Sequence, residues 1–501
     1  MATGHLVAAV VNPAASPVLA IGSTVIDATP TPVKDWAVRN LGTNDKPVLL
    51  GSVALGTVVL AAVIGLVSRR HPRLGALLVV ALAGLAGVAA LSRPTAQPTD
   101  VVPSLVAAGI GAIVLLALGR TLERPAGGPR PVESPLDHTA YAPGSAGRSP
   151  RRSFLVGAVG VAGASVAVGA LGQRLGGGGG TLPSSIALPQ PTTQIPALPV
   201  GLEGGTPGLS PFRTAAKDFY RVDTALVVPR VDAERWQLRV EGSVDHPFTL
   251  SYKELLAMPM VERDITLNCV SNEVGGPYIS STRWLGVSVK AILERAGLRP
   301  GVQQILSTST DGMTISTPVE ALTDDRGALV AVAMDGQPLP AAHGFPARLV
   351  TPGLYGYVGA TKWLTRLTAT TYAAERAYWT KRGWAIDAPV KTQARIDVPQ
   401  GLATQPAGRV AIAGVAWSQA TGGIGKVEVK VDDGPWREAK LGPDAGTVYW
   451  RQWVLAWDAT SGRHQVTVRA TDSAGQVQTT KDAPPFPNGA SGEHSVVVLI
   501  S

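Results

Sequence analysis

The stretch Ile265-Thr266-Leu267-Asn268-Cys269-Val270-Ser271-Asn272-Glu273-Val274-Gly275-Gly276 contains the only cysteine in a chain of 501 residues. A lone thiol cannot form an intrachain disulfide, so Cys269 needs another explanation. The β-rich run 264–267 ends just before the thiol, and a polar, glycine-rich loop follows it. Sites are usually built where strands end in loops. The pattern predicts a thiol at a strand end and favours a soft metal bound through one thiolate.

Other uses of Cys269 stay open from the residues alone. Free cysteine often packs as a small apolar side chain. Cysteine can also act as a nucleophile, with His343 as the candidate base, and the chain would then be a thiol hydrolase. A further alternative is a cofactor-free cell-surface interaction protein that retains the fold. Metal content and alkylation-sensitive hydrolysis distinguish these classes.

The length and charge of the chain limit its class. A chain of 501 residues is long enough for two or three domains. The formal net charge of +8 owes much to arginines between apolar runs in the first third of the chain. Basic and aromatic residues are not interleaved as they are in many nucleic-acid-binding surfaces. We therefore expect no nucleic acid partner.

The first 175 residues have the composition of a membrane protein. Four runs carry no charged residue, and each has about the 20 residues that a helix needs to cross a bilayer. They are 47–68, 74–92, 101–119 and 153–173. The apolar segment 6–26 is a weaker candidate because it contains Asn12 and Pro13. We expect residues 1–175 to form a transmembrane helical region.

The distribution of arginine predicts the orientation of these helices. Cytoplasmic loops carry an excess of Lys and Arg, and the loops after the first and third runs are rich in arginine. These loops contain Arg69, Arg70, Arg73, Arg120, Arg124, Arg130, Arg148, Arg151 and Arg152. With both loops in the cytoplasm, the chain after Arg174 lies outside it. The expected protein is a multi-pass cell-membrane protein with its catalytic domain on the extracytoplasmic side.

The segment Ser149-Pro150-Arg151-Arg152-Ser153-Phe154-Leu155 precedes the fourth run and resembles the twin-arginine export signal. A plain positive-inside flank is the alternative. The twin-arginine pathway exports folded proteins, so it suits a domain that acquires its cofactor in the cytoplasm. Residues 176–211 follow as a Gly/Pro-rich linker, which we expect to be a flexible and then extended tether.

The soluble part divides into two regions. Residues 212–395 mix strand and helix patterns, including a helix over 251–258 with a serine cap and a helix over 287–296 that ends at Gly297. These patterns indicate an α+β domain. Residues 396–501 contain alternating runs separated by turns, which is typical of an immunoglobulin-like β sandwich.

Residues 212–501 resemble the molybdopterin-dependent oxidoreductases of the sulfite oxidase superfamily, in a membrane-anchored bacterial form. The resemblance rests on three separated blocks in order: Thr266-Leu267-Asn268-Cys269, Trp284-Leu285-Gly286-Val287, and His343-Gly344-Phe345-Pro346-Ala347-Arg348 with Pro352-Gly353 and Lys362-Trp363. It implies an α+β sulfite-oxidase-type molybdopterin domain, followed by the immunoglobulin-like domain through which sulfite oxidases dimerise. A homodimer is therefore implied.

The resemblance also implies the cofactor and its ligands. Cys269 would ligate molybdenum through its thiolate, beside the dithiolene sulfurs of the pterin, because soft ligands suit a metal that cycles between oxidation states. Arg348 and Lys362 would hold the pterin phosphate, one by a planar fork and the other by a compact charge. The residues implied to contact the molybdenum-molybdopterin cofactor are Tyr220, Arg221, Cys269, Thr308, His343, Arg348, Ala360, Thr361 and Lys362.

The chain departs from sulfite oxidases where the substrate would bind. Those enzymes carry arginines in the loop after the cysteine, whereas residues 270–273 here are Val-Ser-Asn-Glu. Near the place of their metal-side tyrosine, this chain has Arg382-Gly383-Trp384. We expect oxygen-atom transfer with a small molecule or a sulfoxide, and sulfite oxidation and methionine sulfoxide reduction are the two candidates. The four runs contain no histidine to ligate haem, so electrons need a carrier of unknown identity.

Overall fold

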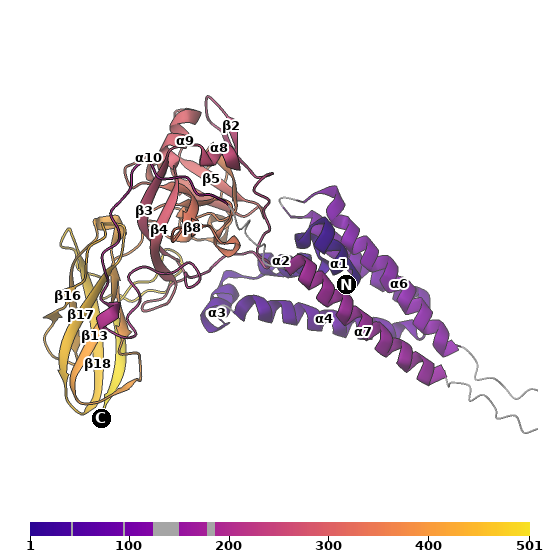
Figure 1. Cartoon of the computed structure of the whole chain (residues 1–501). Helices are drawn as coiled ribbons and strands as arrows, with labels where there is room; N and C mark the ends of the chain where they lie inside the picture. Colours follow the sequence, from indigo (N-terminus) through magenta and orange to yellow (C-terminus); the bar gives the residue numbers. More distant parts are fainter. Residues whose placement is uncertain (42–43, 94–95, 124–149, 178–185) are drawn as a thin grey trace, which may run out of the picture. The chain divides into compact units, whose positions relative to one another are not determined.

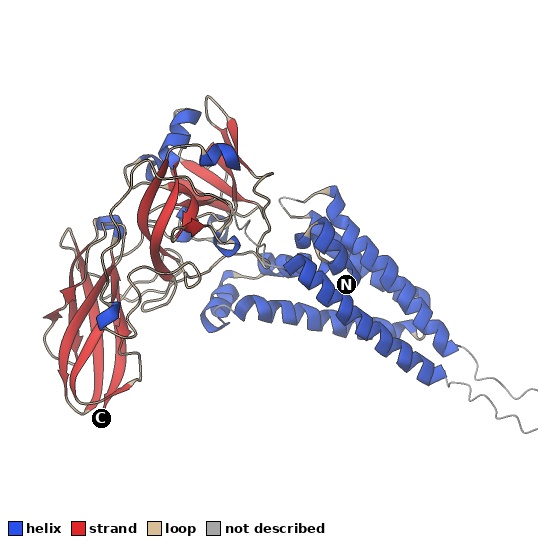
Figure 2. Cartoon of the chain, viewed as in Figure 1, coloured by secondary structure: helices blue, strands red, loops and turns tan. Residues whose placement is uncertain are grey.

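Residues Met1–Gly179 and Gly180–Ser501 form two units in a computed structural model that describes all residues except 42–43, 94–95, 124–149 and 178–185. The first unit is helical, and the second is built mainly from strands (Figure 1 and Figure 2). The helices of the first unit are α1 (Ala2–Val11), α2 (Pro17–Ala28), α3 (Thr31–Leu41), α4 (Asp45–Ser68), α5 (Pro72–Leu91), α6 (Val102–Glu123) and α7 (Pro150–Gly177).

Four helical segments of the first unit are long and apolar enough to cross a membrane. They are Lys46–Ser68, Pro72–Leu91, Pro98–Arg120 and Leu155–Leu175, and they coincide closely with the four predicted runs. Uncharged runs of this length form helices in lipid because a helix satisfies every backbone N–H and C=O internally. Of the arginines used to predict orientation, Arg124, Arg130 and Arg148 lie outside the described residues.

The weaker candidate span 6–26 is not one helix. It is interrupted at Asn12, whose side chain accepts a hydrogen bond from the backbone N–H of Ala14 (3.1 Å), and a 3-10 turn, η1 (Pro13–Ala15), follows. Proline has no backbone N–H to continue the helix. The two resulting helices, α1 and α2, have 10 and 12 residues, which is shorter than a bilayer-spanning helix needs to be.

The sheet that carries Cys269 has the order β3-β4-β7-β8, with β9 paired to β7. A second sheet has the order β2-β1-β10-β5-β6, and its β1 and β10 are parallel. The strands are β1 (Gln237–Gly242), β2 (Phe248–Ser251), β3 (Met260–Asn268), β4 (Ile279–Ser288), β5 (Gln304–Ser309), β6 (Thr314–Pro318), β7 (Leu329–Met334), β8 (Gln337–Pro338), β9 (Arg348–Val350) and β10 (Leu364–Thr370).

Short helices join these strands, and local signals in the sequence explain their ends. Helix α8 (Tyr252–Leu256) begins with the predicted capping box between Ser251 and Glu254. Helix α9 (Val289–Ala296) ends at Gly297, which has a φ of 67°, a conformation that glycine adopts without strain. Two further helices are α10 (Val319–Thr323) and α11 (Gly356–Gly359). The predicted mixture of helix and strand in this region is confirmed.

The C-terminal region consists of two sheets, with orders β11-β13-β17-β16 and β12-β19-β18-β14-β15. Apolar side chains from both sheets, such as Ile412, Trp453, Val468 and Val498, share one core. The strands are β11 (Gln393–Val398), β12 (Thr404–Gln405), β13 (Gly408–Trp417), β14 (Ile424–Val431), β15 (Arg437–Glu438), β16 (Lys440–Leu441), β17 (Arg451–Ala459), β18 (Gly462–Asp472) and β19 (His494–Ile500). The sandwich begins with β11, slightly before the predicted boundary at residue 396.

The proline-rich part of the linker packs on the second unit and is not a free tether there. The backbone N–H of Thr192 donates to Met260 (2.8 Å), and that of Leu202 donates to the Gln452 side chain (2.7 Å). Phe212 is 2% exposed in a core shared with both regions of the unit. Burial of apolar side chains such as Leu209 attaches this part of the linker to the folded surface.

Candidate cofactor site

Cys269 directly follows β3, as predicted. Strand β3 pairs with β4 along its whole length, from Met260 opposite Val287 to Asn268 opposite Ile279. The backbone N–H of Cys269 then donates to the carbonyl of Tyr278 (2.9 Å), which starts the loop back to β4. The residue is 9% exposed. A continuous ladder up to the preceding residue therefore fixes the position of the thiol.

The surroundings of the thiol favour a bound cation. Burial raises the pKa of Cys269, while hydrogen bonds with Ser271 and the positive charge of Lys362 act in the opposite direction. A buried thiolate is thus stable only with a compensating positive charge. Among the described residues, no group of three or more His, Cys, Asp or Glu gathers to hold a metal. A metal at Cys269 would take its other ligands from a cofactor.

Three cationic side chains surround a buried carboxylate. Lys362 Nζ lies 2.9 Å from Asp223 Oδ2, and both side chains are less than a tenth exposed. Arg221 Nε lies 2.8 Å from the same oxygen. The charge of Asp223 also reaches Arg348. Burial lowers the pKa of Lys362 to about 8, against the effect of Asp223. With one negative charge among three positive ones, the site has an unbalanced charge that suits an anion.

Arg348 is the most constrained of these cations. It is 4% exposed, its Nη1 donates to the carbonyl of His343 (3.1 Å), and its guanidinium lies over the Trp284 ring, 5.1 Å from the centroid. Burial lowers its pKa to about 10. Its Nε has no hydrogen-bond partner among the described residues. A buried, unpaired donor is costly unless a ligand accepts from it.

His343 is buried and neutral. Burial, followed by the charges of Arg348 and Lys362, lowers its pKa to about 3. Its ring packs edge-on against Phe219 at 5.7 Å, and its Nδ1 has no partner among the described residues. The thiol of Cys269 is hydrogen-bonded to Ser271 instead of this imidazole. The geometry therefore gives no support to a Cys269–His343 nucleophile pair and leaves Nδ1 available to a polar ligand.

Tyr220 connects the thiol with the cation group. Its ring stacks on Phe219 at 5.5 Å, and its backbone N–H donates to Ser280 Oγ (3.2 Å) on β4. Burial raises its pKa, Cys269 raises it further, and Arg348 lowers it. The phenol is therefore protonated, and its pKa responds to the charges of both Cys269 and Arg348.

The remaining predicted contacts lie on β5 and after α11. The hydroxyl of Thr361 is 2.5 Å from that of Ser307, and the N–H of Ala360 donates to Gly356 (2.9 Å). Side chains alternate along β5, so Ser307 faces Thr361 and Thr308 faces the other side of the sheet. The structure thus brings the side chain of Ser307 to Thr361, and Thr308 as a cofactor contact stays a prediction.

The sequence interpretation missed two residues, Asp223 and Ser307. The sequence did contain a signal for Asp223, because it lies two residues after Arg221. Alternate residues of an extended segment project to the same side, so the two side chains can pair. Ser307 differs from the predicted contact by a single position. A shift of one residue reverses the face of a strand, and only the pairing of β5 with β10 and β6 shows which face is which.

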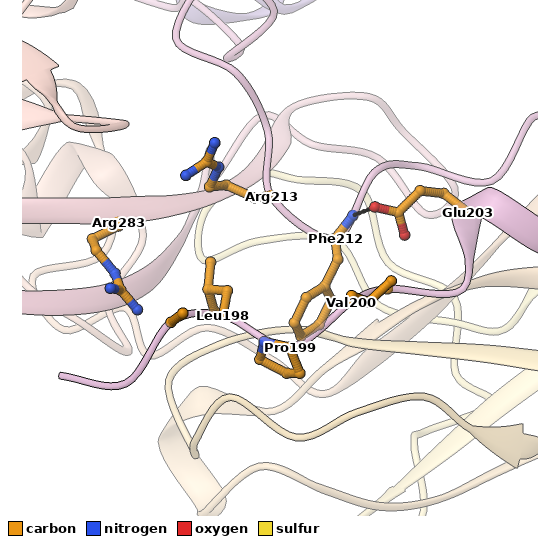
Figure 3. Close-up of a pocket in the computed structure, with 9 residues that line it drawn as sticks. Leu198, Pro199, Val200, Glu203, Phe212, Arg213 and Arg283 are labelled. Atoms are coloured by element: carbon orange, nitrogen blue, oxygen red, sulfur yellow. Dashed lines mark hydrogen bonds between the residues drawn. The ribbon is translucent and has the colours of Figure 1, made fainter.

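A cavity of about 340 Å³ lies elsewhere in the second unit (Figure 3). It is lined by the linker segment around Leu198 and Val200, by Phe212 and by two arginines. Both guanidinium groups are already paired: Arg213 lies 3.1 Å from Asp335, and Arg283 lies 2.8 Å from Asp264. None of the predicted cofactor residues lines this cavity, so it is separate from the thiol.

The site as a whole fits a phosphate-bearing, metal-carrying cofactor. The lone buried thiol supplies one soft ligand, and the cations supply the partners of a phosphate. The unpaired Nδ1 of His343 and Nε of Arg348 are the polar atoms that such a group would satisfy. This fit depends on the chemistry of the side chains present and on their burial.

Comparisons with known proteins match the region of the chain that contains most of these residues. A sequence model of the family described as oxidoreductase molybdopterin binding domain matches residues 225–379. Mitochondrial sulfite oxidase of Macaca fascicularis is 28% identical over 308 residues, covering 52% of this chain and 56% of the relative. The uncharacterized oxidoreductase YuiH of Bacillus subtilis is 32% identical over 153 residues, covering 30% of this chain and 74% of YuiH.

A solved structure shares the fold of the second unit. The sulfane dehydrogenase SoxCD from Paracoccus pantotrophus superposes with a TM-score of 0.51 at 22% identity, covering 58% of this chain and 82% of that chain. The matches to the sulfite oxidases span only about half of their length, 56% for the relative above. The matched family region includes Cys269 and all the cations except Arg221, which lies just before it.

Proposed function

The chain belongs to the sulfite oxidase superfamily of molybdopterin-binding oxidoreductases, whose cofactor is molybdenum-molybdopterin, and we propose that residues 212–395 catalyse oxygen-atom transfer outside the cytoplasm. The observation that carries the proposal is the juxtaposition of a lone buried thiol, Cys269, with a buried cation group that has an excess of positive charge. When bound, molybdenum supplies two-electron oxygen-atom transfer.

The residues of the chain have distinct parts in this proposal. Cys269 holds the metal, and Arg348 and Lys362 hold the phosphate of the pterin. His343 stays neutral, so its Nδ1 can exchange a hydrogen bond with the pterin without adding charge. Tyr220 stays protonated and remains a donor. The burial of Cys269, His343 and Arg348 strengthens the charge interactions at the site.

We propose a small compound with a sulfur–oxygen bond, sulfite or a sulfoxide, as the substrate. Sulfite oxidases among the relatives support the first candidate. The loop after the thiol contains no arginine to bind a sulfite anion, which supports the neutral sulfoxide. Glu273, which would repel an anion, is exposed, so its carboxylate does not occupy the buried thiol site. The substrate class therefore includes both candidates.

Metal content and a substrate panel test this function together. Full-length protein from a host that makes the cofactor should contain one molybdenum per chain by mass spectrometry. It should oxidise sulfite or reduce a sulfoxide with an artificial electron carrier, and nitrate serves as a third substrate. A protein without molybdenum would contradict the proposal and favour the cofactor-free cell-surface interaction protein.

We further propose that the first unit anchors the protein in the cell membrane as a multi-pass region. Four apolar helical segments support this, and the arginine distribution supports an extracytoplasmic second unit. Arg151 and Arg152 lie in the first turn of α7, immediately before the fourth apolar segment. This is the position that a twin-arginine signal occupies, and it agrees with export of a cofactor-loaded domain.

Changing Arg151→Lys together with Arg152→Lys should keep the second unit in the cytoplasm while the first three spans still insert. Lysine retains the charge of a positive-inside flank but not the arginine pair of the signal. Protease accessibility of the second unit in spheroplasts measures the effect. The same double change at Arg69 and Arg70, the pair in another loop, is the control and should leave export intact. Normal export of the Arg151/Arg152 variant would refute a twin-arginine route.

Three finer assignments accompany this function. We propose an immunoglobulin-like type for the C-terminal sandwich, which two mainly antiparallel sheets around one core support. The homodimer implied by the resemblance stays a prediction that light scattering of the detergent-solubilised protein can test. The electron carrier is proposed to be a separate molecule, since the chain has no second cysteine for a cluster.

A further inference from the structure

The loop that follows the thiol is held from the C-terminal sandwich. We call residues 270–278, between β3 and β4, the cysteine loop. The carbonyl of Gly276 accepts a hydrogen bond from Arg395 Nη1 (2.9 Å), and Arg395 belongs to β11. Gly275 has a φ of 77°, and a side chain there would overlap the ring of His494 on β19. Two strands of the sandwich, from different sheets, thus touch adjacent residues of the cysteine loop.

Arg395 is held rigidly by other partners. It is only 8% exposed, its Nε lies 2.6 Å from Asp397, and its Nη2 donates to Ser210 Oγ (2.8 Å). Asp397 also accepts from the backbone N–H of Ser210 (3.0 Å). A guanidinium already fixed by Asp397 and Ser210 has lost its rotamer freedom in advance. The hydrogen bond to the cysteine loop therefore costs little further entropy.

His494 is fixed in the same way. Its Nδ1 accepts a hydrogen bond from the backbone N–H of Ile396 (3.0 Å), which orients the ring. The opposite edge of the ring then lies against Gly275. Burial and the charge of Arg395 lower the pKa of His494 to about 4, so the ring is neutral and Nδ1 can accept. The imidazole therefore contacts β11 of the sandwich with one edge and the cysteine loop with the other.

The strand before the thiol is held from the sandwich too. Gln419 Nε2 donates to the carbonyl of Thr266 (2.5 Å), and the backbone N–H of Trp450 donates to the Thr266 hydroxyl (2.9 Å). Thr266 lies on β3 just before Cys269. The sandwich therefore contacts the chain on both sides of Cys269.

We propose that Arg395 and His494 are positioning residues that set the conformation of the cysteine loop, and with it the direction of the Cys269 thiol. The C-terminal sandwich is then part of the metal site, beyond any role in dimerisation. The effect on the metal site rests on the proposed function. The effect on the conformation of the cysteine loop does not depend on it.

Hydrogen exchange of the full-length protein tests the loop directly. In His494→Ala, amides of the peptide over 270–278 should exchange at least about tenfold faster than in the wild type. His494→Asn keeps an acceptor for the Ile396 N–H but lacks the ring edge that lies against Gly275. Amides of the cysteine loop should therefore still exchange fast, while those of β11 should exchange as slowly as in the wild type. Val498→Ala, a core change on the same strand, is the matched control and should leave the loop unchanged.

A second variant, Arg395→Lys, and a second measurement, electron paramagnetic resonance, also test the proposal. If His494→Ala does not fold, Arg395→Lys serves instead, because lysine cannot hold Asp397, Ser210 and Gly276 at once. In the cofactor-loaded protein, the electron paramagnetic resonance spectrum of the reduced metal should change in the loop variants and not in Val498→Ala. Unchanged loop exchange in both variants would overturn the proposal. Protein without molybdenum would contradict the proposed function and leave the exchange result intact.

Discussion

Replacing Cys269 by serine is expected to leave the second unit folded and to abolish turnover. The change alters one atom at a position whose backbone already donates to Tyr278. A serine hydroxyl keeps its proton at neutral pH and is a hard ligand, whereas molybdenum in this cofactor requires a soft thiolate. Loss of an outer partner of a metal ligand costs about 10- to 100-fold in activity, so loss of the ligand itself should exceed about 100-fold.

Turnover, the thermal unfolding midpoint and molybdenum content measure the effect of Cys269→Ser. The single cysteine provides an internal control, because every alkylation event in the wild type reports on this position. The native, cofactor-loaded protein should resist iodoacetamide, and the denatured protein should react at one thiol. Retained redox activity of the serine variant would refute thiolate ligation.

Arg348→Met is expected to lower cofactor occupancy by at least about tenfold without destabilising the cofactor-free chain. Burial holds the folded pKa of Arg348 near 10, below its ordinary value. The charged group therefore opposes folding at every pH below about 10, and this cost is relieved only as the pH rises through that value. Methionine fills a similar volume without a buried charge. The unfolding midpoint of the cofactor-free variant should be unchanged or raised.

The amount of molybdenum per chain after gel filtration measures cofactor occupancy. Thermal unfolding of the cofactor-free protein measures its stability. Arg366→Met is the matched control, because Arg366 is about half exposed on β10 and pairs with Glu241 at 3.3 Å. This control should change neither quantity much. Arg348→Lys should be intermediate, since it keeps a charge but loses the planar fork. Full occupancy in Arg348→Met would show that the phosphate is held elsewhere.

Local signals in the sequence predicted several elements of the fold. The β-rich run before Cys269 forms the end of β3, and the Ser251 capping box starts α8. The four uncharged runs form long helices. Each of these outcomes depends on residues that are close in sequence, through strand alternation, helix capping or the length of an apolar run. The interruption of 6–26 was signalled by Asn12 and Pro13, but its extent was visible only in the structure.

The site was predicted in part. His343, Arg348 and Lys362 do converge, since both cations act on the imidazole of His343, and the charge of Lys362 also reaches Cys269. Asp223 and Ser307 were missed, the first because its partner Lys362 is far away in sequence, and the second because the facing side of β5 depends on its pairing. The sequence pattern also treated the proline-rich linker as free, whereas hydrogen bonds of Thr192 and Leu202 attach it to the folded unit.

By itself, the sequence determined that this protein has a single thiol at a strand end, cationic residues suited to a phosphate, and a membrane-type first third. Those properties are local or compositional. Only the tertiary structure decided that Asp223 neutralises part of the buried charge and that Arg395 and His494 contact the cysteine loop. Such contacts join segments more than a hundred residues apart, and their geometry depends on strand register and domain packing, which no local pattern encodes.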